Sequence, residues 1–217
     1  MFFLPADKIP STVMAKKAGC EIGDYAVKVN EYLETSVEDV YAIGDCIEVK
    51  SHILGSSTVA PSGTNAVRQA IILANNLTDE KPLSFLPVVN TVVSSVGGCY
   101  YASCGITESF ADTVGIPVVS EYVETYQKAR YYPDNQRIYI KMISQPDGCV
   151  VGCQIISEAD ISSKIDVVSL IILNSYKCED IIRTEFSYTP SSSMIINPLV
   201  QIALKLKKKV KNVNGDI

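Results

Sequence analysis

Residues 34–46 read Glu-Thr-Ser-Val-Glu-Asp-Val-Tyr-Ala-Ile-Gly-Asp-Cys, and this stretch decides how the rest of the chain is interpreted. Its second half, Val40–Gly44, is a short apolar run of β-forming residues that ends at Asp45. Such a run, bounded by polar turn residues, predicts a buried strand that delivers Asp45 at its carboxyl end. A single aspartate after a strand is commonly a turn or capping residue, so its position alone assigns it no function.

The complete stretch resembles the second flavin fingerprint of the pyridine nucleotide-disulfide oxidoreductases, T-S-x-x-x-[IV]-[YF]-A-x-G-D. In that family the aspartate accepts hydrogen bonds from ribityl hydroxyls of FAD, and the matching residue here is Asp45. The resemblance also implies that Gly44 lets the backbone come close to the cofactor, because glycine has no side chain in the way.

A helix is expected to follow the motif, over Pro61–Leu77. Its apolar residues Val67, Ile71 and Ala74 recur at helical spacing, and the proline suits a first-turn position. In the family that the motif resembles, the N-terminus of this helix points at the flavin pyrimidine ring, where the helix dipole favours negative charge. The resemblance therefore implies backbone contacts to the flavin from three residues. These are Ala60, Pro61 and Ser62.

The pattern changes at Lys81–Pro87, where two prolines predict a domain boundary. Beyond it, alternation and turn residues predict strands at 88–96, 99–105, 117–125, 137–144 and 148–156. Helices are expected at 107–114, 161–172, 179–183 and 194–210. The predicted fold class is α+β, with a mixed or antiparallel sheet packed by helices.

This second half resembles the C-terminal dimerisation (interface) domain of the family, in the coenzyme A-disulfide reductase and NADH oxidase branch. The likeness is carried by 129–135 (ARYYPDN) and 186–193 (FSYTPSSS). In that branch, tyrosines of these two pieces reach the partner subunit's CoA and redox-thiol site. The resemblance implies catalytic roles for Tyr131, with Tyr132 as the less favoured choice, and for Tyr188. A tyrosine hydroxyl can donate to a thiolate or a peroxide, and the alternative is a packing tyrosine without chemistry.

Composition excludes several classes of protein. With 47% apolar and 20% charged residues, the 217-residue chain has enough apolar surface for a folded core. The net charge of −5 argues against nucleic acid as a partner. No apolar run reaches the length that a membrane span needs, and no leader pattern is evident, so no membrane partner and a cytoplasmic location are expected.

The seven cysteines form no CxxC pair, and His52 is the only histidine. This pattern predicts neither a disulfide framework nor a metal site, and most of the cysteines are interpreted as small buried residues.

The resemblance implies three parts: a partial NAD/FAD-binding remnant at 1–80, a dimerisation domain at 83–211 and a tail at 212–217. The implied function is that of the C-terminal part of an FAD-dependent NAD(P)H oxidoreductase of the NADH oxidase or CoA-disulfide reductase type. FAD and NAD(P)H are then cofactors of the complete enzyme. The expected assembly is a homodimer, and a separate chain that carries the N-terminal FAD and NAD domains is a further candidate partner.

The chain contains neither a GxGxxG nor a GxxxxGK[ST] phosphate loop. It is therefore not expected to catalyse, or to bind FAD tightly, by itself. A second hypothesis is a stand-alone dimerisation or interaction module descended from such an enzyme. It is favoured by two departures from the branch's pattern, at Ser193 and at Asn197, which replaces an acidic residue before Pro198.

Overall fold

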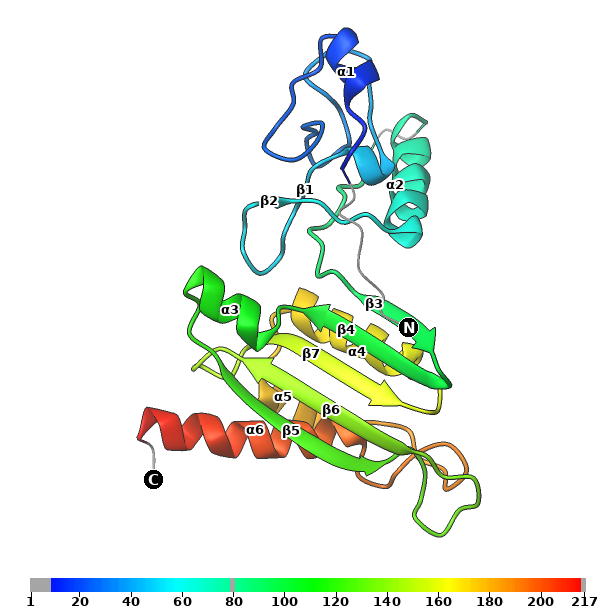
Figure 1. Cartoon of the computed structure of the whole chain (residues 1–217), viewed down its shortest axis with the longest axis vertical. Helices are drawn as coiled ribbons and strands as arrows, with labels where there is room; N and C mark the ends of the chain where they lie inside the picture. Colours follow the sequence, from blue (N-terminus) through cyan, green and yellow to red (C-terminus); the bar gives the residue numbers. More distant parts are fainter. Residues whose placement is uncertain (1–8, 79–80, 216–217) are drawn as a thin grey trace. The chain divides into compact units, whose positions relative to one another are not determined.

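The computed structural model describes residues 9–78 and 81–215. The chain divides into two compact units, Met1–Val88 and Val89–Ile217 (Figure 1). The proline-bearing segment 81–87 precedes this division. Phe85 and Val88 are buried in the core of the first unit, and Phe85 N donates to Glu31 O at 2.7 Å. The segment therefore packs with the first unit.

The first unit has little regular secondary structure. Its elements are α1 (Val13–Lys17), the 3-10 turn η1 (Gly44–Cys46), β1 (Val49–Lys50), β2 (Ser57–Thr58) and α2 (Gly63–Asn76). Strands β1 and β2 pair antiparallel. The buried core consists of Cys20, Val27, Leu33, Ile47, Val49, Phe85 and Val88. This core, rather than a continuous sheet, holds the loops of the first unit together.

The second unit is built on a five-stranded antiparallel sheet with the order β3-β4-β7-β6-β5. The strands are β3 (Val92–Val96), β4 (Cys99–Gly105), β5 (Val119–Tyr126), β6 (Arg137–Ser144) and β7 (Val150–Ser157). The helices are α3 (Glu108–Val114), α4 (Ser162–Leu173), α5 (Cys178–Arg183) and α6 (Pro198–Asn214). The predicted α+β class is confirmed, and the strands expected at 99–105 and 137–144 have the predicted bounds.

Helices cover one face of this sheet. Helix α4 packs on β4 and β7, and helix α6 packs on β5 and β6, with α5 against α6 (Figure 1). The covered face supplies the core because alternate strand residues point toward the helices. Fully buried members of this core are Ile138, Ile140, Met142, Ile155, Ile165, Ile172 and Leu199. The other face exposes Tyr101, Tyr122, Tyr139 and Ile156.

Two glycines face each other across β4 and β7, where Gly105 pairs with Gly152. A Cβ atom at Gly152 would lie 2.0 Å from Ile106 O, and one at Gly105 would lie 2.2 Å from Val151 O. Ile106 N donates to Val151 O at 2.9 Å beside them. The backbones approach so closely here that neither position has room for a side chain.

Helix α6 begins at Pro198, four residues later than expected, because Asn197 caps it. The Asn197 side chain accepts a hydrogen bond from Leu199 N at 2.9 Å, and the proline occupies the first turn. Asparagine and aspartate cap helices about equally well, so Asn197 preserves the helix start despite the lost charge. The helix continues to Asn214 and so includes the first part of the expected tail. Residues 216–217 of that tail lie outside the described residues.

Lysines of α6 cover the outer edge of β5. Lys209 Nζ lies 2.7 Å from Ser120 O, and Lys205 Nζ lies 3.4 Å from Tyr122 O. A third lysine, Lys207, pairs with Glu179 at 2.7 Å. The lysine-rich end of the chain thus makes contacts within its own unit. Within the described part of the chain, no helix has the length and apolar character that crossing a bilayer requires.

Candidate functional site

Asp45 lies in the 3-10 turn η1 and is exposed. The prediction of a buried strand over Val40–Gly44 is wrong. In this stretch only Tyr41 pairs with another segment, through an isolated bridge to Glu34, and residues 40–43 are half-buried. A strand needs a continuous hydrogen-bonded neighbour, and the described residues supply this single bridge. Gly44 has a φ of +84°, a left-handed conformation that favours glycine.

The start of helix α2 lies beside this turn. Ser62 occupies the capping position in an extended conformation, but its side chain does not cap the helix. The Ser62 hydroxyl instead lies 2.7 Å from Thr64 Oγ1. Ala60 O accepts a hydrogen bond from Asn65 Nδ2 at 3.2 Å. Pro61 lies before the helix rather than in its first turn, so the predicted start is wrong by two residues.

Asp45 and Pro61 line one hollow of about 470 Å³ in the first unit. Its other lining residues are Ile9, Pro10, Ser11, Cys46 and Val59. The hollow is thus lined by the Asp45 carboxylate and by Pro61, which lies two residues before helix α2. The N-terminus of this helix has no side-chain cap. First-turn amides of a helix have no intrahelical partner and carry partial positive charge. This pair of groups can accept hydrogen bonds from hydroxyls and stabilise negative charge.

A buried glutamine links helix α2 to the turn that contains Asp45. Gln69 in α2 is 1% exposed, and its Oε1 accepts a hydrogen bond from Gly44 N at 2.6 Å. The apolar residues whose spacing predicted this helix do not face the core, because Val67 and Ile71 are 60% and 56% exposed. The helix instead turns the face of Gln69 and Leu73 inward. No sequence signal distinguished Gln69, since a polar residue in a helix is normally placed on its outer face.

A buried glutamate organises the loop next to the same turn. Glu48 is 6% exposed, and its Oε1 accepts hydrogen bonds from Tyr25 N at 2.6 Å and Ala26 N at 3.3 Å. A Cβ atom at Gly23 would lie 2.3 Å from that carboxylate. The adjacent backbone is paired as well, since Val27 N donates to Cys46 O and Glu48 N donates to Val27 O, both at 2.9 Å. The sequence did not indicate a buried role for Glu48. It lies between the apolar residues Ile47 and Val49, and this alternation is typical of a residue that faces solvent.

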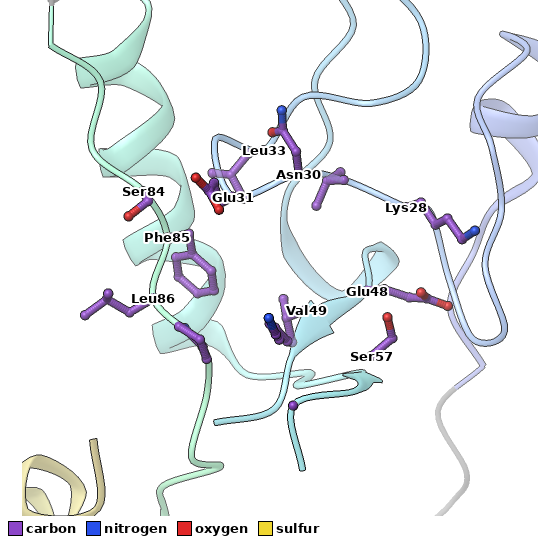
Figure 2. Close-up of a pocket in the computed structure, with 14 residues that line it drawn as sticks. Lys28, Asn30, Glu31, Leu33, Glu48, Val49, Ser57, Ser84, Phe85 and Leu86 are labelled. Atoms are coloured by element: carbon purple, nitrogen blue, oxygen red, sulfur yellow. The ribbon is translucent and has the colours of Figure 1, made fainter. Parts of the chain in front are cut away.

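Glu48 also lines a second hollow of about 450 Å³ in the first unit. Figure 2 shows the labelled side chains around it, including Lys28, Ser57 and Phe85. None of the residues that the sequence predicted to contact the flavin or to act at the active site lines this hollow. It is therefore separate from the hollow beside Asp45.

The two tyrosines expected at a dimeric active site lie together in the second unit. Ala129 N donates to Pro190 O at 3.3 Å and so links the loop of Tyr131 to the loop of Tyr188. A hydrogen bond with Tyr131 raises the pKa of Tyr188. Tyr131 is 77% exposed.

Three neighbouring residues have structural roles in these loops. The Tyr132 ring lies 5.6 Å from Lys128 Nζ and is not part of the tyrosine pair. Asn135 closes the first loop, because its side chain bonds to Lys128 N, Lys128 O and Ala129 O at 2.9–3.0 Å. Ser193 Oγ closes the second loop with a bond to Ser187 O at 3.2 Å. The residue that departs from the family pattern here thus shapes the loop.

The cysteines of the second unit include three buried thiols. Cys104 and Cys153 are cross-strand partners with no exposed surface. Burial raises the pKa of both thiols, and it raises that of Cys178 to about 11. These groups are therefore protonated at neutral pH and behave as small core residues. Among residues 9–78 and 81–215, no group of three His, Cys, Asp or Glu side chains is placed to hold a metal ion.

The five-stranded antiparallel sheet with helices on one face has the fold of the dimerisation domain of FAD-linked reductases. Residues 94–198 match the pyridine nucleotide-disulphide oxidoreductase dimerisation domain, and residues 8–70 match the pyridine nucleotide-disulphide oxidoreductase family model. The chain belongs to the pyridine nucleotide-disulphide oxidoreductases.

Curated relatives show the same likeness. The chain is 40% identical over 203 residues to an NADH oxidase of Methanocaldococcus jannaschii, covering 94% of this chain and 45% of that protein. It is 28% identical over 200 residues to a CoA-dependent NAD(P)H sulfur oxidoreductase of Pyrococcus furiosus, covering 91% of this chain and 45% of that protein. The chain thus spans slightly less than half the length of these relatives.

A solved structure shares the fold. The NAD-dependent persulfide reductase of A. fulgidus superposes with a TM-score of 0.87 at 29% identity. The superposition covers 95% of this chain and 38% of that one.

Proposed function

We propose that this chain supplies the flavin-facing turn and the dimer interface of an FAD-dependent NAD(P)H oxidoreductase of the NADH oxidase or CoA-disulfide reductase type. The observation that supports this most is the hollow that Asp45 shares with Pro61, two residues before α2. The names of the relatives support the class of activity. The N-terminal FAD and NAD domains of such an enzyme, in the same protein or in a separate chain, would complete the site.

The residues beside this hollow have complementary roles in the proposal. The Asp45 carboxylate accepts hydrogen bonds from ribityl hydroxyls, and Gly44 leaves room for the cofactor. The backbone of Ala60, Pro61 and Ser62 faces the flavin ring, where the first-turn amides of α2 stabilise negative charge. FAD, when bound, supplies the electron transfer between the nicotinamide and the final acceptor.

In the second unit, the tyrosine pair is proposed to act at the active site of a partner subunit. The Tyr131 side chain is 77% exposed, so its hydroxyl is accessible to a group of another subunit. An accessible hydroxyl of this kind can stabilise a thiolate or donate to a peroxide.

Weak binding of FAD tests the flavin part of this proposal. One carboxylate and one helix N-terminus contribute only a few kcal/mol, against about 8 kcal/mol for micromolar affinity. Tyrosine fluorescence, with twelve tyrosines and no tryptophan, is therefore expected to stay flat at micromolar FAD. At millimolar FAD, NMR is expected to show shifts of the Asp45 amide and of the amides at the start of α2.

The control for this titration is Asp45→Asn, which keeps the size of the side chain and removes its charge. The shifts are expected to weaken in this variant and to persist in Glu38→Ala, which changes an exposed carboxylate of the same motif. Shifts that avoid Asp45 and α2 in the unmodified chain, or no shifts at all, would contradict the flavin assignment.

The match of residues 94–198 to a dimerisation domain supports self-association. Sedimentation at micromolar concentration is expected to give twice the chain mass of 23.6 kDa. A monomer under these conditions would contradict the homodimer. The same match favours the second hypothesis, a stand-alone dimerisation module, and a dimer without any FAD-induced shift at millimolar concentration would support that function instead.

A further inference from the structure

We infer that Gln69 is the residue that holds the Asp45 turn at a fixed position along helix α2, so that the flavin-facing groups are arranged before any ligand arrives. This inference rests on the proposed flavin role of Asp45. Gln69 itself does not line the hollow, so it is a positioning residue that acts through Gly44.

The first step of the argument is the burial of the Gln69 amide. A primary amide at 1% exposure is costly to bury unless it is hydrogen-bonded. Its oxygen accepts from Gly44 N at 2.6 Å, a contact between residues 25 positions apart. A leucine or methionine would fill this place on the inner face of α2 without that cost. The polar side chain is therefore explained by the backbone amide that it binds.

The second step is the conformation of the turn. Gly44 has a φ of +84°, and a Cβ atom there would lie 3.8 Å from Ala66 Cβ. Ala66 and Gln69 are three residues apart and so lie on one face of the helix. The turn therefore rests on this face through van der Waals contact at Ala66 and through a hydrogen bond at Gln69. The hydrogen bond is the directional contact of the two, and it fixes the residue directly before Asp45.

The third step is the rigidity of the helix between Gln69 and the start of α2. Gln69 lies six residues after Gly63, which corresponds to about 9 Å along the axis. A helix of this length does not change its rise, so anchoring the turn at Gln69 sets the distance between the Asp45 carboxylate and the first-turn amides. Both groups must meet one ligand, and misplacement of either by about 1 Å weakens the joint contact.

Three variants of the full chain test this inference. Gln69→Met has a similar volume but no acceptor, Gln69→Glu keeps an acceptor oxygen, and Ile71→Met changes an exposed residue of the same helix. Two quantities are measured by NMR: hydrogen exchange of the Gly44 amide, and the dissociation constant for FAD at millimolar concentration from the Asp45 amide shift.

In Gln69→Met, the Gly44 amide is expected to exchange at least tenfold faster, and FAD is expected to bind about fivefold more weakly. In Gln69→Glu and Ile71→Met, both quantities are expected to stay within about twofold of the unmodified chain. Both Gln69 substitutions disturb the packing of the site, but only Gln69→Glu keeps an acceptor for Gly44 N. Normal values in Gln69→Glu would therefore assign the loss in Gln69→Met to the missing hydrogen bond and not to general destabilisation.

Loss of Gly44 protection in Gln69→Met with unchanged FAD binding would overturn the positioning role and leave the flavin proposal intact. Protection of Gly44 that does not depend on Gln69 would also overturn it. Absence of any FAD response in the unmodified chain would contradict the flavin proposal itself and, with it, the positioning role, whatever the exchange rates show. The two failures are therefore distinguishable.

Discussion

Gly152→Ala is expected to lower the free energy of unfolding of the second unit by more than about 4 kcal/mol, which is at the extreme of single substitutions. The new Cβ atom would lie 2.0 Å from Ile106 O and 3.1 Å from Ile106 C, both in the backbone. Neither atom can rotate away as a side chain could, so β4 and β7 must separate at this point. Urea unfolding followed by far-UV circular dichroism measures the loss.

Gly98→Ala is the matched control in the same unit. Gly98 has a φ of +80°, but a Cβ atom there would meet nothing within 4 Å. Its replacement by alanine is therefore expected to lower the free energy of unfolding only by the cost of a left-handed conformation, about 1–2 kcal/mol. If both variants lost the same stability, the close approach at Gly152 would not be the cause of the larger effect.

Glu48→Ala is expected to destabilise the first unit by about 3 kcal/mol, because it leaves two backbone donors without their charged acceptor. One of these donors, Ala26 N, belongs to a residue with no exposed surface. The loop at 23–27 is expected to open, and with it the pairing of Val27 with the segment that follows Asp45. Hydrogen exchange of the Val27 and Glu48 amides measures the free energy of this opening.

Two further variants complete the Glu48 experiment. Glu48→Gln keeps an acceptor oxygen and is expected to lose only about 1 kcal/mol, the difference between a charged and a neutral acceptor. Glu38→Ala removes an exposed carboxylate and is expected to stay within about 0.5 kcal/mol of the unmodified chain. If hydrogen exchange of the Val27 amide were unchanged in Glu48→Ala, water would replace the carboxylate without cost. That result would refute the role of Glu48 in stabilising the loop at 23–27.

The sequence predicted the second unit better than the first. Strands β4 and β6 have the bounds that alternation indicated, and Thr107 caps α3 by accepting from Phe110 N. These features depend on local rules, namely the period of two in strands and the preference of threonine for helix starts. The antiparallel sheet connects neighbouring segments, so local information was enough to place most of its elements.

The errors arose where burial depends on distant parts of the chain. Periodicity identified helix α2 correctly, but it could not show that Gln69 rather than Ile71 faces inward. That orientation is decided by the Gly44 amide, which lies far away in sequence. The apolar run before Asp45 looked like a strand, but its residues find a single bridge, to Glu34. Propensity sets a preference for a strand, and hydrogen-bonded neighbours decide whether it forms.

The candidate site was predicted in part. Sequence similarity selected Asp45 and Pro61, and the structure places them on one hollow. It also selected Tyr131 and Tyr188, whose loops the structure links through the hydrogen bond from Ala129 N to Pro190 O, although their catalytic roles stay predictions. Glu48 and Gln69 were missed because each binds backbone amides, and no pattern of side chains records which amides lack a partner.

The lysines of α6 determine where the sheet of the second unit can be extended. An incoming strand at β5 would need the carbonyl groups of Ser120 and Tyr122, and ammonium groups from Lys209 and Lys205 already bind both. Such a strand would have to displace two charged donors before its first hydrogen bond formed. This edge is thereby closed to strand addition and to the aggregation that open edges promote. The C-terminal helix therefore protects the edge of the sheet in addition to packing on its face.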